Sequence, residues 1–187
     1  MQGLTFSKLF KNFDRRLDMD DIDEFQYHLN KAVDKKLENL ESTYKNVSED
    51  DVEDPRDLEG YKSHLEDIMM TTYSSRLLGY ELSIIALYKK VEIKTKKIVG
   101  RMVPNIKEDK LSYFRYLCDA LPFIKSLGNF KAFNELRMLN NAIKHGGLVS
   151  SELVESFPNL SEGNDLKDLD KSYERLLPQI KEYMNEL

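Results

Sequence analysis

The chain has 187 residues, of which 41% are hydrophobic and 33% are charged, and its formal net charge is −5. This length is enough for one domain with a hydrophobic core, and the composition is typical of a soluble, helix-rich protein. The negative charge argues against a protein that coats nucleic acid, although it leaves room for a local basic patch. A single cysteine, Cys118, excludes an internal disulfide framework and favours a reducing compartment.

Two kinds of hydrophobic segment are missing from the sequence. No stretch approaches the roughly eighteen consecutive apolar residues of a membrane-spanning helix. The first residues, MQGLTFSKLFKNF, lack the long apolar region and the small-residue cleavage site of a signal peptide. We therefore expect a cytoplasmic protein without a membrane span.

The N-terminal third of the chain predicts two helices. Residues 1–17 carry apolar side chains at helical spacing. This pattern fits a helix that packs on the main body or one that lies on a membrane surface, and we favour packing. The stretch DMDDIDEF then places acidic residues at a helix start. A helix over about residues 20–45 follows from the apolar residues Ile22, Phe25, Leu29, Val33, Leu37 and Leu40.

A loop and a long helix come next. The acidic stretch NVSEDDVEDPRDLEG contains Pro55 and lacks periodicity, so we interpret it as a solvated loop. The residues from about 61 to 103 keep an apolar stripe that only Gly79 and Gly100 interrupt. One long helix or two helices joined near Gly79 would satisfy the pattern. We favour one helix with at most a kink, closed by Pro104.

The remaining sequence predicts three more helices. LSYFRYLCDALPFI predicts a short helix that ends near Pro122, and NFKAFNELRMLNNAIKH a longer one. Residues 146–167 predict mainly loop, and LDKSYERLLPQIKEYMNEL predicts a closing helix that Pro178 bends. No stretch has the pattern of a strand. We expect an all-α fold, an up-and-down bundle of four to five helices with an extra N-terminal helical segment, in a single domain over residues 1–187.

The stretch ELRMLNNAIKHGG is unusually polar for the end of a helix. Positions four apart stack on one helix face, so Arg137, Asn141 and His145 trace one polar line. Asn140 and Lys144 form a second line beside it. Asparagine is unfavourable inside a helix, because its amide competes for backbone hydrogen bonds. The two asparagines therefore indicate a compensating role, such as holding a neighbouring side chain or a partner.

His145 stands where this helix should end. Gly146 is free to take the left-handed conformation of a helix C-terminus. An imidazole titrates near neutral pH, so His145 suits general acid–base catalysis. The alternative is that His145 only caps the helix and that Gly146 and Gly147 only stop it.

The segment LRMLNNAIKHGG resembles the signature of the HEPN superfamily, helical bundles whose motif helix carries an arginine, a polar residue and, three to five residues later, a histidine. Asn141 and His145 match the polar residue and the histidine. Asn140 stands in the position of the arginine, and Arg137 lies one turn earlier. ELSIIALYKKVEIKTKKI is similar to the preceding helix of that superfamily. The resemblance covers residues 61–187, a HEPN-like core, and leaves the helices and acidic loop of residues 1–60 unassigned.

This resemblance implies a metal-independent endoribonuclease of a bacterial defence, antiviral or toxin–antitoxin system. His145 would be the general acid or base, Arg137 would stabilise charge on phosphorus, and Asn141 would orient His145 or the phosphate. Asn140 and Lys144 would contribute to binding. The resemblance also implies a homodimer that joins two motif helices in one cleft, and an antitoxin or defence-system protein as a partner. It implies no metal and no other cofactor.

Basic residues between positions 89 and 115, among them Lys94, Lys97 and Arg101, suit contacts with RNA phosphates, or form a solvated helix face. A second hypothesis is a non-catalytic HEPN-like module that binds nucleotide, RNA or a protein partner, because Asn140 cannot supply the charge of an arginine. A third is a plain helical bundle in which the motif only orders a dimer interface.

Overall fold

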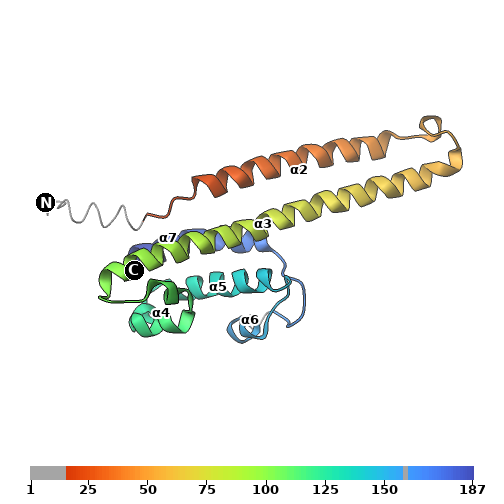
Figure 1. The fold of residues 1–187 in the computed structure, drawn as a ribbon. Helices are drawn as coiled ribbons and strands as arrows, with labels where there is room; N and C mark the ends of the chain where they lie inside the picture. Colours follow the sequence, from red (N-terminus) through yellow and green to blue (C-terminus); the bar gives the residue numbers. More distant parts are fainter. Residues whose placement is uncertain (1–15, 158–159) are drawn as a thin grey trace. The chain divides into compact units, whose positions relative to one another are not determined.

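The computed structural model describes residues 16–157 and 160–187, which are mainly helical (Figure 1). The α-helices in these residues are α2 (Asp20–Asn46), α3 (Leu58–Met102), α4 (Phe114–Ala120), α5 (Phe130–Lys144), α6 (Ser151–Ser156) and α7 (Leu169–Glu186). Short 3₁₀ turns lie at Glu49–Asp51, Pro55–Asp57, Glu108–Ser112 and Ile124–Ser126. The described residues form helices and no β-strand, so the predicted all-α class is confirmed. The helix predicted over residues 1–17 falls, up to residue 15, outside the described residues.

Helix α3 decides between the alternatives that the sequence leaves open at Gly79. It runs without interruption for 45 residues, from Leu58 to Met102, so the prediction of one helix is confirmed. The acidic stretch before it is a loop with two 3₁₀ turns, but its last residues already belong to α3. Helix α2 also agrees with its predicted bounds to within a residue.

The segment after α5 is more ordered than the sequence predicts. Mainly loop is expected over residues 146–167, but α6 forms a short helix there. Ser150 caps its start, since the serine side chain accepts a hydrogen bond from the Leu153 N–H at 3.3 Å. The closing helix α7 forms as predicted and continues through Pro178.

The chain divides into two compact units. The first unit is a helical hairpin of residues 20–82, formed by α2 and the first part of α3. Among the described residues, the second unit joins residues 16–19 with residues 83–187, which include the rest of α3 and helices α4 to α7. All of the predicted site residues lie in this second unit. A single domain over residues 1–187 stays a prediction.

In the hairpin unit, Gly79 permits a close approach of α2 and α3. Gln26 Nε2 donates a hydrogen bond to the Gly79 carbonyl at 3.0 Å. A Cβ atom added at Gly79 would lie 2.0 Å from Leu29 Cδ2. Arg76 pairs with Asp34 across the same two helices. The glycine that the sequence marks as a candidate helix break therefore serves helix–helix packing.

In the second unit, α5 and α7 are joined by an aromatic stack and an ion pair. The rings of Phe133 and Tyr183 stack with centroids 4.6 Å apart and an interplanar angle of 3°. Arg175 Nη1 donates to Glu135 Oε2 at 3.0 Å, and a second bond joins the same two side chains. These contacts orient α5 about its axis, and so determine which of its residues reach the surface.

Alanine substitutions at two glycines of α3 would test the close approach. At Gly60 a Cβ atom meets nothing within 4 Å, so Gly60→Ala should raise the free energy of unfolding by about 0.5–1 kcal/mol. Gly79→Ala should instead lower it, because overpacking against Leu29 costs about 1–3 kcal/mol. In a Leu29→Ala background, Gly79→Ala should become stabilising. Urea unfolding followed by circular dichroism measures all three; equal stabilisation by the two single glycine variants would contradict the packing.

Candidate functional site

Helix α5 carries the motif, and it exposes its motif residues mainly at the carboxyl end. Figure 1 shows α4, α6 and α7 around this helix. Its buried residues are Ala132, Phe133, Glu135, Leu136, Arg137, Met138, Leu139, Asn140 and Ala142. Asn141 and Ile143 are half-buried, whereas Lys144 and His145 are exposed. A ligand from solvent can therefore reach the motif at the last turn.

The helix ends at two glycines, as the sequence predicts. Gly146 and Gly147 have φ angles of 116° and 74°, which glycine adopts without strain. The Gly147 N–H donates to the Ala142 carbonyl at 2.9 Å, and the Gly146 N–H to the Ile143 carbonyl at 3.5 Å. These are the two bonds of a Schellman motif. The resulting turn brings the following residues beside the last turn of α5.

Backbone hydrogen bonds anchor the loop after this turn. The Val149 N–H donates to the Asn164 carbonyl at 2.8 Å, and the Gly163 N–H donates to the Val149 carbonyl at 3.0 Å. The Leu166 N–H donates to the Gly147 carbonyl, also at 3.0 Å. Main-chain bonds thus hold the loop in place, so its side chains remain available for other contacts.

A pocket of about 450 Å³ lies between the end of α5 and the start of α6. It is lined by Asn141, Ala142, His145, Leu148, Val149, Ser150, Ser151 and Glu152. The structure thus brings Asn141 and His145 together with two hydroxyl groups and a carboxylate. Amide, hydroxyl and imidazole groups can donate and accept hydrogen bonds, so the pocket suits a small polar group of a ligand.

Arg137, the predicted charge-stabilising residue, is not among the residues that line this pocket. It is only 8% exposed, and its Cζ atom lies 4.2 Å from the centroid of the Phe114 ring. Its Nε atom donates to Asn134 Oδ1 at 3.1 Å, and its Nη2 atom donates to Glu152 Oε1. Because Glu152 also lines the pocket, it links the pocket to the buried guanidinium.

Asn140, which stands where the HEPN pattern has its arginine, is 1% exposed. Its Nδ2 atom donates to Asn141 Oδ1 at 3.3 Å. Its own Oδ1 atom is buried without a hydrogen-bond partner among the described residues. The side chain predicted to contribute to binding therefore contacts the amide of Asn141 from the interior.

The predicted basic residues do not join the pocket. Lys94, Lys97 and Arg101 lie on α3, and none of them lines it. Lys94 Nζ donates to the Arg16 carbonyl, whereas Lys97 and Arg101 are exposed. Lys144 is exposed in the last turn of α5. The basic run of α3 and the polar pocket are thus two separate features of the second unit.

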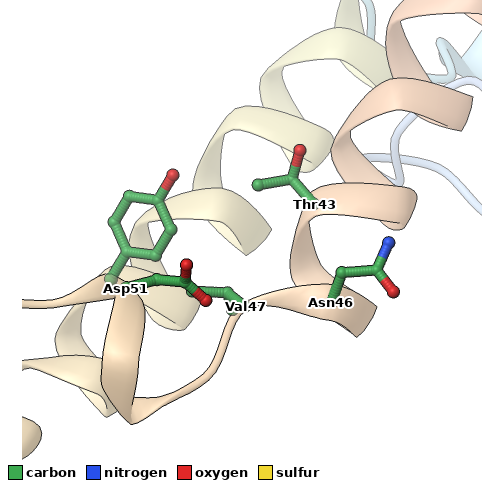
Figure 2. Close-up of a pocket in the computed structure, with 5 residues that line it drawn as sticks. Thr43, Asn46, Val47 and Asp51 are labelled. Atoms are coloured by element: carbon green, nitrogen blue, oxygen red, sulfur yellow. The ribbon is translucent and has the colours of Figure 1, made fainter.

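A smaller pocket, of about 300 Å³, lies at the closed end of the hairpin unit (Figure 2). It is lined by Thr43, Asn46, Val47, Asp51 and Tyr61. Ser48 donates two hydrogen bonds of 2.9 Å to Asp51 Oδ2, one from its backbone and one from its side chain. These bonds hold the pKa of the Asp51 carboxyl below its usual value. The one acidic group of this pocket therefore already stabilises its own turn.

Comparisons with protein-family models, with curated proteins and with solved structures found no match to this chain. In the described part of the chain, histidine, cysteine and acidic side chains form no group of three that could hold a metal ion. None of the helices in residues 16–157 and 160–187 combines the length and the hydropathy that a membrane crossing requires. The HEPN resemblance thus depends on the motif and its helical setting.

Glu152 is the charged residue among the lining residues that the sequence does not indicate, which also include Leu148, Val149, Ser150 and Ser151. It lies seven residues after His145, in a segment that the sequence predicts as loop. Seven residues span two turns of a continuous helix, but α5 ends before Gly146, so helical spacing does not connect the two positions. The turn at Gly146 and Gly147 and the short helix α6 bring them to one pocket, and local sequence does not encode that proximity.

Restoring the arginine of the HEPN pattern should destabilise this protein. In Asn140→Arg a guanidinium would replace a side chain that is 1% exposed, and a buried charge without a partner costs about 3–5 kcal/mol. The control Asn141→Arg changes a half-buried neighbour and should cost under about 1 kcal/mol. Urea unfolding of both variants measures the difference; equal losses would show that position 140 is no more enclosed than position 141.

Proposed function

We propose that this chain is a HEPN-like, metal-independent endoribonuclease whose reaction centre is the pocket at the end of α5. The observation that supports this most directly is that Asn141 and His145, the two residues that match the motif, both line that pocket. His145 is exposed, so a ligand as large as RNA can reach it. The setting that the resemblance implies is a bacterial defence or toxin–antitoxin system, with an antitoxin or another defence protein as partner.

In the proposed reaction, His145 moves a proton. The ribose 2′-oxygen attacks the phosphorus atom, the bond to the 5′-oxygen breaks, and a 2′,3′-cyclic phosphate forms. His145 takes the proton from the 2′-hydroxyl or gives one to the leaving 5′-oxygen, and the second His145 of the proposed dimer or a water molecule makes the other transfer, so that no net proton is taken up. The step needs no other reactant, since the nucleophile belongs to the RNA itself.

Asn141 is oriented for binding a phosphate group. Its Oδ1 atom accepts a hydrogen bond from Asn140 at 3.3 Å. An amide whose oxygen is engaged in this way has its two N–H groups left to donate. Phosphate oxygens are acceptors, so the Asn141 amide is complementary to them. Lys144 in the same turn adds positive potential near the pocket.

The proposed homodimer would have to use the end of α5. Most of this helix is covered by its own chain, and Asn141, Ile143, Lys144 and His145 belong to its accessible last turn. Leu148, next to this turn, is an apolar side chain that is exposed. We therefore place the dimeric cleft at the carboxyl ends of two α5 helices.

Three observations favour the second hypothesis, a non-catalytic module that binds nucleotide, RNA or a protein partner. Glu152 forms an ion pair with the guanidinium of Arg137, and Asn140 stands in the position of the arginine of the HEPN pattern. Among the residues that line the pocket, His145 is the only basic one. Such a site can bind a ligand through hydrogen bonds while it gives little stabilisation to the charge of a phosphoryl transition state.

Cleavage of a structured RNA in the presence of EDTA tests the proposed activity. We expect the wild type to cleave and His145→Ala to lose at least about 100-fold in rate, as the loss of a general acid or base does. His28→Ala is the matched control, because His28 is an exposed histidine on α2. The products should carry 2′,3′-cyclic phosphate ends. Equal cleavage by the wild type and His145→Ala would refute the role of His145, and RNA binding without cleavage in all three proteins would favour the second hypothesis.

A further inference from the structure

We propose that Glu152 controls phosphate binding in this pocket. Its carboxylate forms an ion pair with the Arg137 guanidinium in the free protein, and an incoming phosphate group displaces the carboxylate from the guanidinium. The proposal rests on the proposed function, since it assigns the anion site to the same pocket. It starts from one geometric fact, namely that Glu152 both lines the pocket and binds Arg137.

The two partners of this ion pair differ in how firmly they are held. The Arg137 side chain is 9% exposed, and it also binds Asn134 and stacks on Phe114. The Glu152 side chain is 54% exposed, and Arg137 is its one hydrogen-bond partner in the described part of the chain. Glu152 belongs to α6, a helix of six residues. The carboxylate is therefore the partner that can leave.

A buried guanidinium restricts how the carboxylate leaves. Removing the partner of a buried charge is costly, because the remaining charge has neither water nor a counter-ion. Glu152 therefore does not simply swing out; another anion has to take its place. The guanidinium fork binds phosphate and carboxylate with the same geometry, so phosphate is a direct competitor.

The hydrogen bonds of Arg137 leave room for this exchange. Its bonds to Asn134 and Glu152 use two of the five N–H groups of the side chain. The bond to Asn134 and the stacking on Phe114 do not involve Glu152, so they can persist after the exchange. A bound phosphate would then meet Arg137 at the position of the Glu152 carboxylate, in the wall of the pocket that Asn141 and His145 also line. The pocket lacks a guanidinium among its lining residues, and ligand binding would thus bring the Arg137 guanidinium into contact with the ligand.

Inorganic phosphate is the probe, and Glu152→Gln is the decisive variant of the full chain. Glutamine keeps the shape of the side chain but does not compete as an anion, so phosphate should bind at least about tenfold more tightly than to the wild type. Glu155→Gln is the matched control, because Glu155 is an exposed glutamate of the same helix and the variant changes the net charge equally. Its affinity should equal that of the wild type. Titration calorimetry measures the three dissociation constants.

A second readout requires no substitution. The NMR signal of Arg137 Nε–H in the wild type should shift when phosphate is added, because a new anion then binds the guanidinium. Circular dichroism should verify that the Glu152→Gln variant is folded; if it is not, Glu152→Asp, with a shorter carboxylate, replaces it and should bind phosphate more tightly than the wild type.

The outcomes separate this proposal from the proposed function. An affinity in Glu152→Gln no higher than in Glu155→Gln, or an unchanged Arg137 signal at saturating phosphate, would overturn the displacement of Glu152, even if the wild type cleaves RNA. Tighter phosphate binding by Glu152→Gln together with an absence of RNA cleavage would support the displacement and reject the nuclease.

Discussion

The second unit depends on a buried guanidinium that must have an anion. Arg137 stacks on Phe114 of α4, binds Asn134 of its own helix and pairs with Glu152 of α6. Because a buried cation without a counter-ion is strongly unfavourable, this pairing holds α6 beside α5. Together with the main-chain hydrogen bonds of the loop and the burial of Leu153, this ion pair forms the wall of the pocket. The same requirement explains why an outside anion has to replace the carboxylate before the guanidinium can serve a ligand.

The two adjacent asparagines of α5 have different roles. Asn140 faces the interior, and Asn141 lines the pocket. The hydrogen bond between their amides links the two positions, so the buried residue determines how the accessible one is oriented. This arrangement accounts for polar residues in a helix that would otherwise favour alanine or leucine. It also explains why asparagine, which is small and neutral, fits at position 140.

The positions of the helices follow from local sequence to a large extent. Apolar residues at three- and four-residue steps mark α2, α5 and α7, because a helix must bury one face. Gly146 and Gly147 mark the end of α5, because the chain there takes positive φ angles. The role of Gly79 is different. Glycine inside a helix signals either a break or a close neighbour, and only the position of Leu29 on α2 shows that it is the second.

The sequence by itself determined the all-α class, most of the helix bounds, and the presence of Asn141 and His145 at the carboxyl end of one helix. These features depend on periodicity and on backbone conformation, which neighbouring residues control. The tertiary structure alone decided that Arg137 is buried, that Asn140 lies behind Asn141, and that Glu152 joins the pocket. Burial and ion pairing depend on which helices meet in space, and a helical repeat does not specify its partners.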